Sequence, residues 1–453
     1  MRTVNYLNWK NALLCRSERN HRMIEERIGC ANLTRRLAVL FAVTTLFACA
    51  SAQTPAGTNY DESKGGSYTL PDPLTFQNGI RVRSAADWQQ RRAEILGLFE
   101  ENVFGRSPKA PSSINYKVFD TDKNALSGKA TRKQVTIYFS PKQDGPKEDV
   151  LIYIPNSAKK PVPLILSLNF SGNQAVIDDP GVKLATVWGR TTHQPETAKE
   201  DSRGKDKNFE VEKVLDRGYG FATINYQDIE PDFDGGISHG IRPLFYKSRQ
   251  TEPASDDWGA IGAWSYGLSR AMDYLEKDKD VDSKRVAVMG HSRLGKTVLW
   301  TGAQDQRFAM VLASCPGEGG ASLARRNYGE TIRNLTERFP FWFAPNLKKY
   351  ADNPDQLPVD MHELIALSAP RRVYVTGAES DKWADPKGEF LALVAAGPVY
   401  QLLGGEGLGT DQMPALNQPI QHTLAYHYRT GKHEVTDFDW EQFLQFADAH
   451  LRR

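Results

Sequence analysis

The 453-residue sequence predicts an α/β protein in which a mostly parallel central sheet has helices on both faces. Three observations predict it. Short β-rich apolar runs recur along the chain, amphipathic segments of helical length separate them, and an alternating hairpin precedes them. Strands that alternate with helices pair in parallel, because each helix returns the chain to the same end of the sheet.

The fold is expected to begin with a helix and a hairpin. Residues 87–104 place apolar side chains such as Trp88 and Ile95 at helical spacing. Residues 134–139 and 150–154 are strand-like and flank a polar turn, which predicts an antiparallel pair. A hairpin that leads into a parallel sheet fits the α/β-hydrolase fold.

The rest of the chain alternates between predicted strands and helices. The strands are expected at residues 164–170, 220–226, 285–290, 309–315, 372–377 and 424–428, and the main helices at 258–275, 295–304, 389–403 and 440–450. In open α/β sheets, ligands bind beyond the carboxyl ends of the strands. Catalytic residues are therefore expected in the loops that follow strands.

Composition excludes several classes of protein. With 40% hydrophobic and 25% charged residues, the chain has an ordinary globular composition, which excludes disordered, collagen-like and coiled-coil proteins. Of the 57 Lys/Arg and 55 Asp/Glu residues, eight and three lie in the first 52 positions, so 49 and 52 remain after them. No basic stripe is left to bind a polyanion, and no nucleic-acid partner is expected.

The N-terminal 52 residues resemble an export signal. A basic stretch is followed by an apolar run at 37–48 and by the small residues Ala50-Ser51-Ala52, as at a signal-peptidase site. Residues 46–49 also resemble a lipoprotein box, which would place a lipid anchor on Cys49. A buried N-terminal helix is the structural alternative. We expect an exported protein that is periplasmic, an outer-membrane lipoprotein or secreted.

The domain organisation follows from this leader. Residues 1–52 are predicted to be a signal peptide or lipoprotein signal, 53–70 a flexible lead-in, and 71–453 a single catalytic domain. Three of the four cysteines lie in the predicted leader, so Cys315 has no intramolecular disulfide partner and stability depends on the core. No metal-ligand spacing occurs. We expect no metal, no cofactor and a monomer.

Ser292 is the candidate nucleophile. Residues 285–296 read as an apolar strand, a sharp turn bounded by Gly290 and Gly295, and the start of a helix. Such a strained turn projects a serine Oγ above the sheet, and the next backbone N–H faces the developing oxyanion. The second glycine comes one place later than usual, and a simple helix N-cap serine is the alternative.

A serine nucleophile needs a base, which in this fold comes last in the chain order Ser, acid, His. His433 lies between the last predicted strand and the last predicted helix, which makes it the best candidate. The other histidines after Ser292 are expected to be structural: His362, His422, His427 and His450.

The acid is expected after the penultimate strand, where three carboxylates compete. Asp381 lies at the apex of this loop and is preferred over Glu379 and Asp385. An ionised carboxylate there would hold the histidine in one tautomer and stabilise its protonated form.

The residues around Ser292 also carry a resemblance. Gly-His-Ser-Arg-Leu-Gly-Lys at 290–296 resembles the Gly-x-Ser-Arg-x-Gly-Lys signature of the glucuronoyl esterases, carbohydrate esterase family 15. Further stretches similar to bacterial members extend from about residue 70 to the end: 169–173, 217–220, 231–232, 326–330, 366–371 and 383–386.

The resemblance implies a reaction and a binding site. It implies hydrolysis of esters that join the carboxyl of 4-O-methyl-glucuronate on xylan to lignin alcohols, so the partner is a lignin–carbohydrate ester of glucuronoxylan. By the same resemblance, Arg293 helps to stabilise the oxyanion. Lys296, Glu330 and Trp383 would hold the uronate ring.

Two departures from the family pattern concern the acid and the sugar contacts. Many fungal relatives place the acid after the strand that here ends in Cys315, and a thiol cannot replace a carboxylate. The acid is therefore expected to be Asp381, with Glu318 as the weaker alternative. The fungal glutamine that contacts the sugar has no evident match, because Ser322 lies near its expected place.

Two other functions stay open at this point. Fold and triad do not determine the substrate, so another carbohydrate esterase, similar to acetyl xylan esterases, or a broad carboxylesterase is the enzymatic alternative. An inactive hydrolase-fold binding protein of the cell envelope is the alternative from another class. The intact set of Ser292, His433 and Asp381 argues against it.

Overall fold

A computed structural model of the chain describes residues 58–141, 143–189 and 191–452. The chain divides into Met1–Gly57 and Thr58–Arg453, and all described residues belong to the second unit. The predicted export signal and Cys49 lie outside them. Within the described residues, no helix has both the length and the apolar character needed to cross a membrane.

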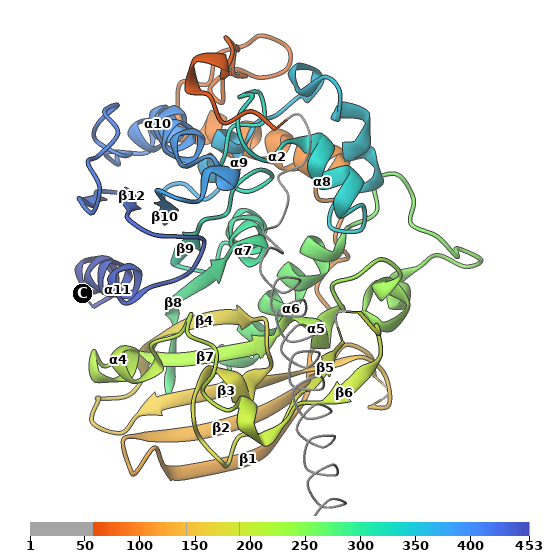
Figure 1. Cartoon of the computed structure of the whole chain (residues 1–453), viewed down its shortest axis with the longest axis vertical. Helices are drawn as coiled ribbons and strands as arrows, with labels where there is room; N and C mark the ends of the chain where they lie inside the picture. Colours follow the sequence, from red (N-terminus) through yellow and green to blue (C-terminus); the bar gives the residue numbers. More distant parts are fainter. Residues whose placement is uncertain (1–57, 142, 190, 453) are drawn as a thin grey trace, which may run out of the picture. The chain divides into compact units, whose positions relative to one another are not determined.

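The described part of the chain is organised around a ten-stranded sheet (Figure 1) with the order β1-β2-β3-β7-β4-β8-β9-β10-β12-β11. Its strands are β1 Asn115–Ala125, β2 Ala130–Tyr138, β3 Lys147–Pro155, β4 Val162–Asn169, β7 Gly220–Asn225, β8 Val281–His291, β9 Met310–Ser314, β10 Arg372–Ala378, β11 Ile420–Gln421 and β12 Leu424–Arg429. A separate pair consists of β5 Thr186–Trp188 and β6 Pro195–Thr197.

The sheet is mostly parallel, as predicted. Strands β7, β4, β8, β9, β10 and β12 pair in parallel, whereas β1, β2 and β3 are antiparallel and β3 joins β7 antiparallel. The predicted hairpin is confirmed, with Gln134 opposite Leu151. Strand β1 was not predicted, because this edge strand is mostly exposed and carries no apolar run.

The helices of the described residues confirm every long helix that the sequence predicts. They are α2 Ala85–Asn102, α3 Asn173–Val176, α4 Val211–Asp216, α5 Tyr226–Ile229, α6 Ala260–Leu275, α7 Arg293–Gln304, α8 Ile332–Arg338, α9 Met361–Ala366, α10 Pro386–Leu402 and α11 Asp437–Leu451. Short 3₁₀ helices are η1 Glu62–Lys64, η2 Glu200–Ser202, η3 Gly236–His239, η4 Arg242–Phe245, η5 Pro345–Tyr350, η6 Pro354–Gln356 and η7 Lys382–Ala384.

Two hydrophobic cores cover the two faces of the sheet. One contains Trp88 of α2 and Trp264 of α6, and the other contains Trp440 and Phe443 of α11. All eight residues of β4 are buried, as expected for a central strand with helices on both faces. The fold is therefore the predicted α/β-hydrolase fold, in which the loops after β8, β10 and β12 lie at one edge of the sheet.

Residues 58–65, which we call the strap, contact the loop at 326–330. The backbone N–H of Gly329 donates to the carbonyl of Asn59, and that of Asn327 donates to the carbonyl of Gly65. Both carboxylate oxygens of Glu62 accept hydrogen bonds from the Arg326 guanidinium, at 2.7 and 2.6 Å. The described part of the predicted lead-in is thus joined to a loop that carries a candidate site residue.

Candidate active site

Ser292 lies in a sharp turn between β8 and α7. Its backbone has φ 60° and ψ −129°, a strained conformation for a residue with a side chain. A Cβ on Gly290 would lie 2.1 Å from the carbonyl oxygen of Leu294, so only glycine allows this turn. The side chain of Ser292 makes no capping hydrogen bond with α7. Ser292 thus occupies the N-cap position of α7 without capping the helix through its side chain, and the geometry is that of a nucleophile elbow.

The late position of the second glycine has a structural reason. A Cβ on Gly295 would meet the carbonyl oxygen of Ser314 at 3.1 Å and Cβ of Pro316 at 3.2 Å. Gly295 therefore allows the first turn of α7 to pack closely on the chain that leaves β9. The backbone N–H of Arg293 at the start of this helix has no intrahelical acceptor, which suits binding of an oxyanion.

His433 and Asp381 are 52 positions apart in sequence and meet in the structure. Nδ1 of His433 lies 2.5 Å from Oδ2 of Asp381. The parallel pairing of β10 with β12 brings their loops together, and the N–H of Ser380 donates to the carbonyl of Gly431 at 2.9 Å. The Asp381 side chain is 5% exposed and that of His433 is 41% exposed. The carboxylate is thus buried behind an imidazole that stays open to solvent.

The loop of His433 is held by a buried arginine that sequence reasoning missed. Arg429 forms an ion pair with Asp439 at 2.7 Å. Its guanidinium also donates to the carbonyls of Lys432 and Glu434, on either side of His433. In the sequence, Arg429 appears only as the end of the last strand, so no local signal predicts this role.

Cys315 occupies the position where fungal relatives were expected to carry the acid. It is buried with φ 44°, and its Sγ, a carboxylate oxygen of Asp381 and a ring nitrogen of His433 lie within 4.8 Å of one another. Burial raises the pKa of this thiol well above its ordinary value. Cys315 therefore faces the imidazole as a neutral group.

The competing carboxylates have other environments. Glu318 is buried, and burial raises the pKa of its carboxyl well above the usual value. It has no hydrogen bond to His433, and its Oε1 has no partner among the described residues. Asp385 pairs with Arg326 at 2.9 Å, and Glu379 is exposed. Of the carboxylates considered, the structure brings Asp381 to His433.

The other histidines have structural partners. Nε2 of His362 lies 2.8 Å from the carbonyl of Pro71, and Nε2 of His427 lies 2.8 Å from Asp439. His422 pairs with Glu406, and His450 contacts the ring of Phe446. None of these four contacts involves Ser292 or His433.

His291 is a neighbour of the site that sequence reasoning missed. Its ring centroid is 4.5 Å from that of His433, and its Nδ1 lies 3.2 Å from Oγ of Ser314. Burial, together with the nearby His433, lowers the pKa of His291 well below its ordinary value. A neutral ring thus packs beside the candidate base. The position of His291 directly before Ser292 in the sequence could have identified it as a neighbour of the site.

The guanidinium of Arg293 is held in a defined position. Its Nη1 donates to Oδ2 of Asp232 at 2.6 Å, and the guanidinium carbon lies 5.5 Å from the Phe170 ring and 5.0 Å from the Trp342 ring. Asp232 also accepts hydrogen bonds from Trp342 Nε1 at 2.6 Å and from the Tyr226 hydroxyl at 3.0 Å. This side chain is preorganised beside the elbow.

Lys296, Glu330 and Trp383 also come together. Nζ of Lys296 donates to Oε2 of Glu330 at 3.1 Å, and the N–H of Glu330 donates to the Trp383 carbonyl at 2.8 Å. Nζ of Lys296 also donates to the carbonyls of Pro316 and Glu318 at 2.8 and 2.5 Å. All three ammonium donors are used within the protein. Lys296 can therefore bind a sugar hydroxyl only by exchanging one of these bonds.

Ser322 and the strap support the same group. Oγ of Ser322 donates to the carbonyl of Ala384 at 2.5 Å, so it braces the Trp383 loop. Arg326 joins Glu62 of the strap to Asp385, the residue after that loop. The contact between the strap and this loop had no signal in the sequence.

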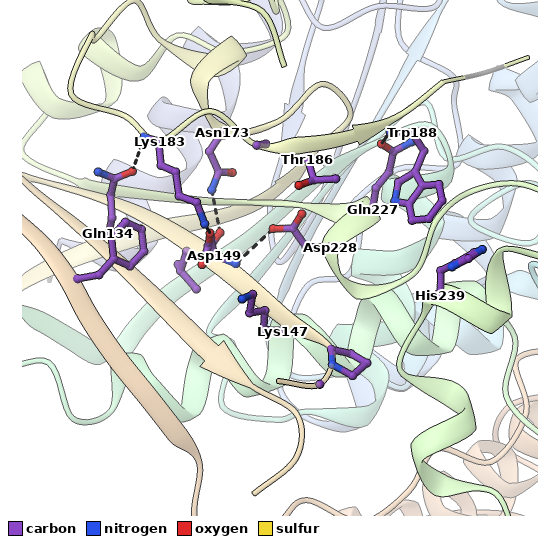
Figure 2. Close-up of a pocket in the computed structure, with 15 residues that line it drawn as sticks. Gln134, Lys147, Asp149, Asn173, Lys183, Thr186, Trp188, Gln227, Asp228 and His239 are labelled. Atoms are coloured by element: carbon purple, nitrogen blue, oxygen red, sulfur yellow. Dashed lines mark hydrogen bonds and ion pairs between the residues drawn. The ribbon is translucent and has the colours of Figure 1, made fainter. Parts of the chain in front are cut away.

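Two cavities lie on the β4–β7 side of the elbow. The Arg293 cavity, of about 530 Å³, is lined by Phe170, Trp188, Gln227, Asp232, Phe233 and Arg293, among others. The Asp228 cavity, of about 250 Å³, is lined by Lys147, Asp149, Trp188, Gln227, Asp228 and His239, among others (Figure 2). Trp188 and Gln227 line both cavities.

Comparisons with known proteins agree on one family. The family model described as "Glucuronyl esterase, fungi" matches residues 218–404. A solved glucuronoyl esterase from Solibacter usitatus is 52% identical, covering 86% of this chain and all of that one, with a TM-score of 0.84. Carbohydrate esterase MZ0003, from an unknown prokaryotic organism, is 47% identical over 88% of this chain and 93% of its own length. A 4-O-methyl-glucuronoyl methylesterase of Podospora anserina is 27% identical over 76% of this chain and 62% of its own.

Proposed function

Because the chain belongs to carbohydrate esterase family 15, the glucuronoyl esterases, we propose that it hydrolyses esters of 4-O-methyl-glucuronate. Its substrate is the bond between this uronate on glucuronoxylan and an alcohol of lignin. The name of the Podospora anserina relative, a 4-O-methyl-glucuronoyl methylesterase, supports the acyl group. The observation that carries the proposal is the strained Ser292 elbow together with the 2.5 Å contact between His433 and Asp381.

The reaction proceeds through an acyl-enzyme. Oγ of Ser292 attacks the ester carbonyl while His433 accepts its proton, and Asp381 stabilises the imidazolium. The Arg293 N–H and guanidinium stabilise the negative oxygen of the tetrahedral intermediate. The C–O bond to the alcohol then breaks, and His433 protonates the leaving oxygen.

Deacylation repeats these steps with water. His433 takes a proton from water, the resulting hydroxide attacks the acyl carbonyl, and Oγ of Ser292 leaves with the proton from His433. The products are free glucuronate and regenerated enzyme. No step needs a metal or a cofactor.

Uronate recognition falls to the group around Glu330. Oε2 of Glu330 accepts from Lys296 at 3.1 Å, and the carboxylate can accept a further hydrogen bond from a sugar hydroxyl. The half-buried Trp383 offers an apolar face to the pyranose ring. Lys296 binds a sugar hydroxyl by exchanging one of its hydrogen bonds to Pro316, Glu318 or Glu330 for one to the sugar.

Initial rates on three esters test the proposal: the benzyl ester of 4-O-methyl-glucuronate, the benzyl ester of galacturonate and an aryl acetate. We expect the glucuronate ester to be preferred and Ser292→Ala to lose about 10⁶ in turnover. Preference for the acetate would favour a broad carboxylesterase. Failure of a serine-reactive phosphonate to label the protein stoichiometrically would favour the inactive binding protein.

We also propose that the protein is exported and acts as a monomer. The basic, apolar and small-residue segments at 1–52 support export, and Cys49 is the proposed lipid attachment point. Fractionation of cells that express the full chain or Cys49→Ala tests the anchor. If the full chain is found in the membrane fraction and Cys49→Ala is not, the lipid anchor is supported. If the two proteins distribute in the same way between the membrane and soluble fractions, the anchor is excluded.

A further inference from the structure

An ester has an acyl side and an alcohol side. In this fold, the two groups of residues that could bind them follow strands on opposite sides of β8. Ser292 follows β8, near the centre of the strand order. Glu330 and Trp383 come from chain segments after β9 and β10, on one side of β8. The Arg293 and Asp228 cavities are lined mostly by chain after β4 and β7 and by β3, on the other side, and Phe339, from the segment after β9, completes the Arg293 cavity. If the uronate occupies the first side, the alcohol extends into the second.

The Arg293 cavity suits an aromatic alcohol. Phe170 and Arg293 line it, and so do Trp188 and Phe233, whose ring centroids lie 5.5 Å apart. Its volume, about 530 Å³, is within the range of sites that hold drug-sized ligands. This cavity therefore accommodates the ring next to the ester.

The Asp228 cavity adjoins the Arg293 cavity, because Trp188 and Gln227 line both. Its volume of about 250 Å³ is below the roughly 300–1,000 Å³ of typical ligand sites, which suits one further ring. The ring of His239 packs against Trp188 with centroids 4.6 Å apart, beside the amide of Gln227 (Figure 2). The boundary that the two cavities share is thus aromatic.

Polar groups without protein partners line the Asp228 cavity. The amide oxygen of Gln227 accepts from the backbone of Trp188 at 3.0 Å, whereas its Nε2 has no hydrogen bond within the described residues. The Lys147 ammonium and the His239 ring also make no hydrogen bond there. Donors therefore face the cavity without an acceptor.

Two lysines and two carboxyl groups line the cavity. Lys183 pairs with Asp149 at 2.6 Å, and Lys147 and Asp228 are the other two charged groups. Burial, followed by the nearby Asp149 charge, raises the pKa of Asp228 to about 7. A neutral ring with several acceptor oxygens fits this surface better than a charged group does.

We propose that the Asp228 cavity binds a second aryl unit of the lignin alcohol, through ether, methoxyl or hydroxyl oxygens on that ring. The inference rests on the proposed function and deepens it. It names the preferred leaving group as an aryl alcohol with two linked rings, rather than a single benzyl group.

Three esters of 4-O-methyl-glucuronate test the proposal: methyl, benzyl and 4-(2-methoxyphenoxymethyl)benzyl. We expect kcat/KM to be highest for the two-ring ester. In the double variant Lys147→Ala/His239→Ala, the ratio of kcat/KM for the two-ring ester to that for the methyl ester should fall about tenfold, the effect of losing two ordinary hydrogen bonds. Lys109→Ala, an exposed lysine outside both cavities, should leave the ratio unchanged.

Results that contradict the cavity proposal can be told apart from the result that would refute the proposed function. Equal kcat/KM for the two-ring and benzyl esters in the wild type would overturn the cavity assignment, and so would a ratio that stays constant in the double variant. A methyl ester extended by xylose on the sugar side is the fourth substrate. If the variant impairs this ester instead, the cavity binds xylan and the proposal is wrong. Absence of wild-type turnover on every uronate ester would refute the proposed function itself.

Discussion

Replacing Asp381 by asparagine tests the assignment of the acid. The change removes the negative charge 2.5 Å from Nδ1 of His433 and keeps the size of the side chain. The charge matters at the moment when His433 takes the proton of Ser292, because the imidazolium then needs a counterion. An asparagine amide can also donate to Nδ1, which favours the tautomer that cannot accept the serine proton.

The magnitude follows from burial. The same change at a fully buried triad costs about 10⁴ in kcat. Here the acid is buried, but the His433 side chain is 41% exposed, so water stabilises part of the imidazolium charge. We expect Asp381→Asn to lose about 10² to 10³ in kcat, or about 2.7–4 kcal/mol of transition-state stabilisation, with little change in KM.

Steady-state kinetics on the benzyl ester of 4-O-methyl-glucuronate measure this loss, with circular dichroism to confirm folding. Cys315→Ala should be nearly silent, because its neutral thiol carries no charge to the imidazole. Cys315→Asp in the Asp381→Asn background should recover activity, since position 315 faces His433. A threefold or smaller loss in Asp381→Asn, with a large loss in Glu318→Gln, would refute the assignment.

Three further changes have defined outcomes. Arg293→Ala should lower kcat by about 10² to 10³ on uronate esters and barely raise KM, whereas a pure KM effect would restrict it to substrate binding. Glu148 is buried without a hydrogen-bond partner among the described residues, and burial raises its pKa well above 4.5, so its ionisation costs more free energy in the folded chain than in the unfolded one. Wild-type stability from this group is thus lost as the pH rises above about 4.5. Urea unfolding above that pH should show Glu148→Gln gaining on the wild type by up to about 1.4 kcal/mol per pH unit; a constant difference would contradict this. Glu62→Gln weakens the half-exposed pair with Arg326, so KM for uronate esters should rise up to about fivefold while that for an aryl acetate stays constant; equal changes would indicate general damage.

The sequence alone determined the features that depend on neighbouring residues. The hairpin, the parallel strands and the long helices follow from periodicity, because burial on one or two faces imposes an apolar pattern on each element. The position of Ser292 follows from the same local logic, since a strand, a glycine-bounded turn and a helix are enough to form the elbow. Strand β1 escaped because an exposed edge strand needs no apolar run.

Only the tertiary structure decided which distant groups meet. The choice of Asp381 over Glu318 depends on the pairing of β10 with β12, which brings the loops of Asp381 and His433 together, and neither loop sequence records that pairing. Arg429 behind His433 and Glu62 beside the Trp383 loop are likewise invisible in sequence. Their roles come from contacts between segments far apart in the chain, whereas periodicity reports only the environment of a single element.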